Sequence, residues 1–131
     1  MKKVVIDTNV LVSSLLSPHG NANKIMEDIS YNKFKIVYSK EILEEYERVL
    51  NYDKLDLSPE TQIKAIAGIC KRGELIEPNT SNEPLSDEDD RVFYDVAKDS
   101  DAILITGNIK HYPSKPFIMN PSDFLKMIES K

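Results

Sequence analysis

The chain has 131 residues, 40% of them hydrophobic, with one cysteine, two histidines and a formal net charge of −5. This length and composition predict one globular domain over residues 1–131. A single cysteine excludes an internal disulfide, and one cysteine with two histidines excludes a structural zinc cluster. The negative net charge is not typical of a nucleic-acid-binding protein, although local basic side chains or bound cations can offset it.

Apolar strands and amphipathic helices alternate along the sequence. In chain order we expect a strand at Lys2–Ile6, helices over residues 8–16 and 21–29, a strand at Phe34–Tyr38, helices over residues 40–50 and 59–72, a short strand at residues 75–76, a helix over residues 87–98, strands at residues 102–106 and 116–119, and a last helix from Pro121. This alternation predicts βαβ units and an α/β fold, a three-layer α/β/α arrangement around a mainly parallel sheet.

Short polar residues at the helix starts predict the caps. Thr8 or Asn9 is expected to cap the first helix, Ser39 the third, and Ser86 the helix over residues 87–98. Cys70 lies in an apolar run, so we expect it to be a small core residue.

Two strands end in polar residues that are candidates for a functional site. Asp7 follows the first strand directly, and Thr106, Gly107 and Asn108 end the strand at residues 102–106. In open parallel sheets, ligands bind just outside the carboxyl ends of the strands. If both strands are central, these polar ends converge on one edge, with Asp7 at its centre.

A run of four acids opens the helix over residues 87–98, at Asp87, Glu88, Asp89 and Asp90. The helix dipole explains one or two acids in a first turn, but four repel one another unless a cation lies among them. Asp90 precedes the apolar Phe93 by three residues, so it is expected to point toward the sheet. Asp90 is therefore the main candidate, and Asp87 and Asp89 are weaker ones.

The helix over residues 40–50 contributes a glutamate. Glu45 borders the apolar stripe that contains Ile42 and Tyr46, whereas Glu44 is expected to face solvent. Carboxylates from different elements, together with asparagine or threonine oxygens, suit hard cations such as Mg²⁺ and Mn²⁺. We therefore predict a metal site that includes Asp7, Glu45 and Asp90.

Four segments together resemble the PIN-domain nuclease family over nearly the whole chain. The opening Val-Val-Ile-Asp-Thr-Asn-Val-Leu-Val-Ser resembles the start of the family, with Asp7 as its first metal-binding acid. Residues 39–46 resemble the second motif, where Glu45 best fits the acid, and residues 87–93 and 102–108 resemble the third and fourth. The segment from Thr106 to Pro113 is similar to one in PIN proteins described as toxins of toxin–antitoxin pairs.

The resemblance implies a sheet in the order 3-2-1-4-5, cleavage of RNA that depends on Mg²⁺ or Mn²⁺, a small antitoxin protein as partner, and a homodimer. By the same resemblance and the residue types, Asp7, Glu45 and Asp90 would be catalytic and bind the metal, with Asn108 and, more weakly, Asn9, Asp87 and Asp89. Substrate contacts are expected from residues near the same edge: Asn9, Thr106, Lys40, Arg91, Lys110 and His111.

One departure from the family pattern affects activity. Asn108 stands where many PIN nucleases carry aspartate, so the site has one negative charge fewer. A weak or inactive PIN-like module that binds RNA or protein is therefore an alternative. A phospho-signalling receiver is a second alternative, because Thr106 and Lys115 resemble its motifs, although the gap between them is too short for an intervening helix.

The sequence also carries expectations about location. Asp7 interrupts the apolar start, so no signal peptide is expected, and no apolar run reaches transmembrane length. We therefore expect a cytoplasmic protein without membrane contact.

Overall fold

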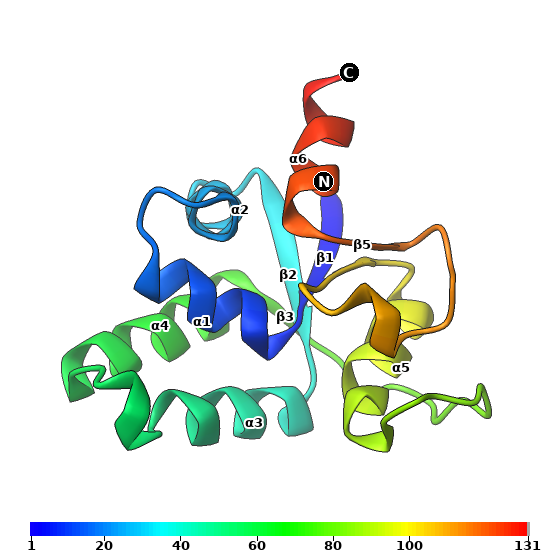
Figure 1. Cartoon of the computed structure of the whole chain (residues 1–131), viewed down its shortest axis with the longest axis horizontal. Helices are drawn as coiled ribbons and strands as arrows, with labels where there is room; N and C mark the ends of the chain where they lie inside the picture. Colours follow the sequence, from blue (N-terminus) through cyan, green and yellow to red (C-terminus); the bar gives the residue numbers. More distant parts are fainter. Residues whose placement is uncertain (131) are drawn as a thin grey trace.

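Five parallel strands form the centre of the structure, a computed structural model that describes residues 1–130 (Figure 1). The strands are β1 Lys2–Ile6, β2 Phe34–Tyr38, β3 Glu74–Leu75, β4 Ile103–Ile105 and β5 Ile118–Met119. Their order in the sheet is β3-β2-β1-β4-β5, and each neighbouring pair is parallel. The predicted fold class and strand order are both confirmed.

The central strands are buried on both faces, as their continuous apolar sequences predict. Val4, Val5 and Ile6 in β1 are fully buried, and so are Leu104 and Ile105 in β4. Strands of this kind need helices on both sides of the sheet. This burial is the reason that β1 and β4 lie at the middle of the sheet and not at an edge.

Within residues 1–130, six α-helices surround the sheet: α1 Thr8–Leu16, α2 Asn21–Ser30, α3 Lys40–Leu50, α4 Pro59–Arg72, α5 Arg91–Ser100 and α6 Pro121–Glu129. Helix α5 packs on β1, β2 and β4, while α2 packs on β2 and against α1 and α6. In Figure 1, α1, α2 and α4 lie to the left of the strands and α5 lies to the right, which gives the three layers.

The structure corrects three local predictions. Asp7, and neither Thr8 nor Asn9, is at the N-cap of α1. The acidic run is a short 3-10 helix, Glu88–Asp90, and α5 begins only at Arg91. This turn is capped by Asp87 and not by Ser86, because the Asp87 side chain accepts a hydrogen bond of 2.9 Å from the Asp89 backbone N–H. The acids therefore lie in a turn ahead of the helix.

Cys70 is also placed differently from the prediction, because it is exposed. In α4 the neighbouring Ile69 is buried, and one residue along a helix turns the side chain by about 100°. Helix α4 packs against the rest of the molecule along a narrow stripe of its surface, so the side chain of Ile63 is exposed as well.

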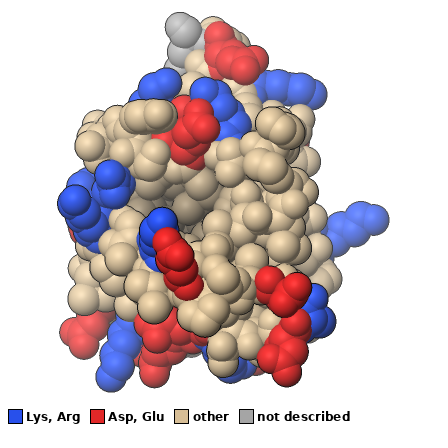
Figure 2. All heavy atoms as spheres, turned by 90° about the vertical axis from the view of Figure 1, so that its left-hand side faces the viewer, with Lys and Arg blue, Asp and Glu red and all other residues tan. Residues whose placement is uncertain are grey.

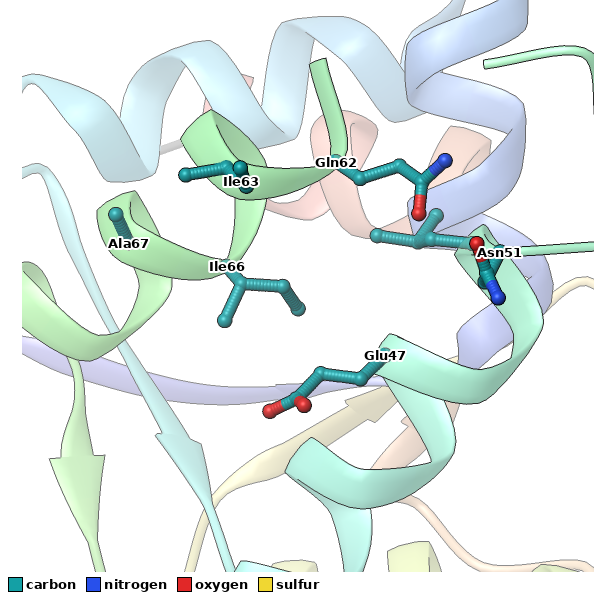
Figure 3. Close-up of a pocket in the computed structure, with 7 residues that line it drawn as sticks. Glu47, Asn51, Gln62, Ile63, Ile66 and Ala67 are labelled. Carbon is teal, nitrogen blue, oxygen red and sulfur yellow. The ribbon is translucent and has the colours of Figure 1, made fainter. Parts of the chain in front are cut away.

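Helices α3 and α4 leave a hollow between them (Figure 3). Its volume is about 460 Å³, and it is lined by Glu47, Leu50, Asn51, Gln62, Ile63, Ile66 and Ala67. On the face shown in Figure 2, acidic and basic side chains are interspersed around a mostly uncharged, hollowed centre, as is typical of a solvated surface. Among the helices within residues 1–130, none is long and apolar enough to span a membrane.

Candidate active site at the carboxyl end of the sheet

Asp7 occupies a capping position but is held by residues outside its own helix. Its backbone is extended at the start of α1, yet among the described residues its side chain makes no capping hydrogen bond. Instead its Oδ2 accepts hydrogen bonds from Thr106 Oγ1 at 2.7 Å and from the Tyr112 hydroxyl at 3.0 Å. With only 6% of its surface exposed, Asp7 is a rigid, nearly buried carboxylate.

The strand register explains why Thr106 reaches Asp7. Ile6 in β1 pairs with Ile105 in β4, so the next residue of each strand lies at the same edge. Thr106 is fully buried, and its Oγ1 also accepts a hydrogen bond of 3.0 Å from the Asn108 backbone N–H. Although Thr106 is predicted to contact substrate, in this structure its hydroxyl faces Asp7 and positions that carboxylate.

Tyr112 was not among the residues expected in the site. Burial, followed by the nearby negative charges of Asp7 and Asp90, raises the pKa of its hydroxyl well above the usual range. Tyr112 therefore remains a neutral hydrogen-bond donor to Asp7 at ordinary pH. Its only signal in the sequence is its place in the segment after Thr106, because the chain reaches Asp7 through the 3-10 turn Ile109–His111.

Glu45 faces the same edge from α3. Thr8 Oγ1 donates a hydrogen bond to Glu45 Oε2, and Arg48 Nη2 lies 3.7 Å from Glu45 Oε1. The neighbouring Tyr46 is buried and donates a hydrogen bond to the Ile6 carbonyl, which fixes the rotation of the helix. As a result Glu45 is partly buried, with 22% of its side chain exposed, whereas Glu44 is exposed.

Asp90 completes the group of acids. Burial, followed by the negative charges of Asp7 and Asp87, raises its pKa to about 6, with a smaller contribution from Glu45 and an opposing one from His111. Within residues 1–130 the buried Asp90 Oδ2 has no hydrogen-bond partner, and His111 Nδ1 lies 3.7 Å from it. Asp90 is thus close enough to Asp7 and Glu45 for their negative charges to disfavour its ionised form.

Asp7 and Asp90 line one cavity of about 370 Å³. The other lining residues are Thr8, Asn9, Val12, Val49, Tyr52, Lys54, Leu55 and Asn108. Asn9 Oδ1 accepts a hydrogen bond of 3.1 Å from the Gly107 backbone N–H, which ties the ends of β1 and β4 together. The sequence did not indicate Tyr52 or Lys54, because Lys54 lies in the short 3-10 turn Asp53–Leu55 beyond the end of α3 and Tyr52 is at the N-cap of that turn.

The remaining predicted residues do not line this cavity. Asp87 caps its own turn, and Asp89 is exposed. Lys40, Lys110 and His111 are exposed side chains. The Arg91 guanidinium, expected near phosphate, instead donates hydrogen bonds to Ser81, Glu83 and Glu88, which hold the loop before the acidic turn against α5.

A family model described as PIN domain matches residues 3–110. The chain belongs to the PIN-domain family. PIN domains are in general nucleases, and the match contains Asp7, Glu45, Asp90 and Asn108.

Similar proteins agree with this placement. The uncharacterized protein MJ1680 of Methanocaldococcus jannaschii is 39% identical over 109 residues, which cover 81% of this PIN domain chain and 70% of that protein. The crystal structure of PAE2754 from Pyrobaculum aerophilum superposes with a TM-score of 0.62 at 11% identity, over 100% of this chain and 91% of that one. VapBC2 from Rickettsia felis, bound to a DNA fragment from their promoter, gives a TM-score of 0.56 at 17% identity, over 90% of this chain and 96% of that one.

The topology also decides against the receiver alternative. Receiver domains have the strand order 2-1-3-4-5, whereas this PIN domain has 3-2-1-4-5. Thr106 and Lys115 therefore resemble receiver motifs only locally.

The donors in the cavity suit a hard divalent cation. Among residues 1–130, no three His, Cys, Asp or Glu side chains are gathered in a way that could hold a metal ion. Mg²⁺, however, commonly binds through one or two carboxylates and keeps several waters. Asp7 and Asp90 supply two carboxylates, and the buried Asp90 Oδ2 without a hydrogen-bond partner is an oxygen that a cation would satisfy.

Proposed function

We propose that this PIN domain is an endoribonuclease that depends on Mg²⁺ or Mn²⁺ and hydrolyses phosphodiester bonds of RNA. The observation that carries the proposal is the convergence of Asp7, Glu45 and Asp90 at the carboxyl end of the sheet. The raised pKa of Asp90, to about 6, reflects burial and repulsion by the negative charges of Asp7, Asp87 and Glu45. A cation between the carboxylates would relieve that repulsion.

In this proposal Asp7 and Asp90 hold the metal, with Glu45 and Asn108 contributing directly or through water. A bound divalent cation supplies a water of lowered pKa and neutralises charge on the phosphate oxygens. Thr106 and Tyr112 keep Asp7 in one orientation through their hydrogen bonds to Oδ2. Thr8 likewise bonds Glu45 Oε2, and Arg48 lies beside Oε1, so both oxygens of this carboxylate have neighbours that orient it.

We further propose that the protein acts as the toxin of a toxin–antitoxin pair, with a small antitoxin protein as partner, and that it forms a homodimer. Support comes from the family and from the structural similarity to VapBC2. Of the predicted phosphate contacts, Asn9 lines the cavity, while Lys110 and His111 lie in the turn that follows Asn108.

The proposal is tested with the purified protein and a fluorescently labelled single-stranded RNA. Cleavage is measured while Mg²⁺ or Mn²⁺ is titrated, with EDTA in a parallel sample. We expect cleavage that appears with the metal, disappears with EDTA and is lost in Asp7→Asn. Metal-independent cleavage, or equal cleavage by Asp7→Asn, would overturn the proposal.

One observation favours the second candidate, a PIN-like module that binds RNA or protein with little cleavage. Asn108 lines the cavity as a neutral side chain. The same titration separates the two candidates, because a binding module retains RNA without cutting it at any metal concentration.

A further inference from the structure

The turn after α3 brings an aromatic ring and an ammonium group into the lining of the acidic cavity. Tyr52 and Lys54 line it together with Asp7 and Asp90. Tyr52 is 41% exposed, unlike Tyr46 and Tyr112, which are buried. Lys54 is a basic side chain in a lining that otherwise contributes carboxylates, amides and apolar groups.

The turn fixes the backbone of Tyr52. The Tyr52 backbone N–H donates to the Val49 carbonyl at 3.0 Å, and the Leu55 N–H donates to the Tyr52 carbonyl at 3.1 Å. Lys54 Nζ lies 5.8 Å from the centre of the Tyr52 ring, within the range of a cation–π contact. The aromatic ring and the ammonium group therefore lie next to each other in the lining of the cavity.

The cavity therefore has two chemically different parts. The carboxylates and amides lie at the ends of β1 and β4 and in the acidic turn, where a metal and a phosphate would bind. Val12 of α1, Val49 of α3 and Tyr52 form the apolar part, and α1 and α3 lie side by side (Figure 1). Tyr52 lies two residues beyond the end of α3, the helix that carries Glu45.

We propose that Tyr52 stacks on a base of single-stranded RNA that neighbours the cleaved phosphate, while Lys54 contacts the backbone phosphate beside it. This inference rests on the proposed function and assigns Tyr52 and Lys54 to the binding of its RNA substrate. A base inside a duplex is stacked on both sides and does not reach the ring, whereas an unpaired base stacks on an aromatic side chain without regard to its identity.

The first experiment measures binding and cleavage of a labelled single-stranded RNA by Tyr52→Leu and Tyr52→Phe. Tyr31→Leu is the matched control, because Tyr31 is exposed at the end of α2 and is not in the lining of this cavity. Affinity without divalent metal is measured by fluorescence anisotropy, and kcat and KM are measured with Mn²⁺. We expect Tyr52→Leu to weaken binding and raise KM by about 5- to 150-fold, with kcat less affected, and Tyr52→Phe and Tyr31→Leu to resemble the unsubstituted protein.

The second experiment replaces the bases of the RNA one at a time with an abasic position. For the unsubstituted protein, one position should account for the loss of affinity, and Tyr52→Leu should be insensitive at that position. Because the scan itself uses the unsubstituted protein, it does not depend on how well a variant folds. Lys54→Met should reduce the slope of log affinity against log salt by about one, since one phosphate contact is removed.

The outcomes for this inference and for the proposed function are distinct. If the protein cleaves RNA with metal but Tyr52→Leu has unchanged affinity and KM, or no abasic position matters, the stacking role is wrong and the nuclease stands. If the protein binds RNA with the expected Tyr52 dependence but never cuts it, the nuclease is wrong and the stacking role stands. If single-stranded RNA is neither bound without metal nor cleaved with Mn²⁺, both are wrong.

Discussion

Helix α3 borders two hollows of similar size that differ in chemistry. Val49 of this helix lines the acidic cavity of about 370 Å³, whereas Glu47 and Leu50 line the α3–α4 hollow of about 460 Å³ (Figure 3). The lining of the larger hollow contains one carboxylate, that of the exposed Glu47. The acidic cavity contains Asp7 and Asp90, with Glu45 close enough to influence the pKa of Asp90.

The difference arises from where the strands end and not from the volume of the hollow. Glu47 is an exposed carboxylate, and water solvates its charge. Asp7 and Asp90 are held together at the end of a buried sheet, where their repulsion is screened less. Substitutions in the two hollows therefore test whether metal binding and RNA cleavage depend on the acidic cavity alone.

Asp7→Asn is expected to have the largest effect. The substitution removes a proposed metal ligand while the Thr106 and Tyr112 hydroxyls keep a side-chain oxygen to bond. Cleavage should fall by more than about 100-fold, since even residues that only support metal ligands contribute about 10- to 100-fold. Calorimetry should show weaker Mn²⁺ binding, whereas Glu47→Gln in the α3–α4 hollow should leave both unchanged. Equal Mn²⁺ affinity in Asp7→Asn would remove Asp7 from the site.

Glu45→Gln is expected to reduce cleavage by about 10- to 100-fold. The side chain is partly buried and bonded to Thr8, whereas Glu44 on the same helix faces solvent. Glu44→Gln is therefore the matched control and should retain full activity in the same kinetic assay. Loss of activity in Glu44→Gln but not in Glu45→Gln would contradict this assignment of the two glutamates.

Asn108→Asp is expected to lower the metal concentration at half-maximal activity by roughly tenfold, the effect of about 1.4 kcal/mol of added attraction for a cation. Asn108 lines the acidic cavity, so a carboxylate there would join Asp7 and Asp90. Activity is measured against Mn²⁺ and Mg²⁺ concentration for both proteins. The same midpoint and the same rate would show that Asn108 lies outside the site and occupies its place as a turn residue.

Asp90→Asn is expected to have the smallest effect, on stability without metal. Because the pKa of Asp90 is raised to about 6 in the folded protein, the folded state holds its proton more tightly than the unfolded state does. The stabilising contribution of the protonated form is complete below about pH 4, the ordinary value for aspartate, and is lost as the pH rises through 6.

Asp90→Asn should therefore melt above the unsubstituted protein at pH 7.5, by only about 1–3 °C since solvent screens part of the repulsion, and should show no such difference at pH 4. Thermal denaturation with EDTA at both pH values measures this. Saturating Mn²⁺ should reverse the order at pH 7.5, because the cation stabilises only the form that binds it. If Asp90→Asn raised the melting temperature more at pH 4 than at pH 7.5, repulsion of the ionised Asp90 would not be the cause.

The parts of the site that strands and regular helices position could be predicted from the sequence. Asp7 directly follows an apolar strand, and the spacing of Ile42 and Tyr46 sets the direction of Glu45. The structure brings both to the expected edge. The strand order was predicted through the resemblance to the PIN family and is confirmed.

Two residues beside short turns could not be predicted. Tyr52 is at the N-cap of the 3-10 turn Asp53–Leu55, Tyr112 follows the 3-10 turn Ile109–His111, and the direction of such turns depends on tertiary packing. The role of Asp87 as a cap depends on a backbone conformation that an acidic run does not specify. Cys70 was predicted wrongly because local apolarity does not reveal how much of α4 the rest of the molecule covers.

The hydrogen bond between Tyr112 and Asp7 gives the protein an internal optical signal. The chain has no tryptophan and six tyrosines, so its near-ultraviolet absorbance and its emission come mainly from phenol rings. A phenol bonded to a carboxylate changes its spectrum when a cation draws charge from that carboxylate. Metal arrival at Asp7 is therefore expected to shift the tyrosine difference spectrum of the unlabelled protein, and Tyr112→Phe should remove that shift.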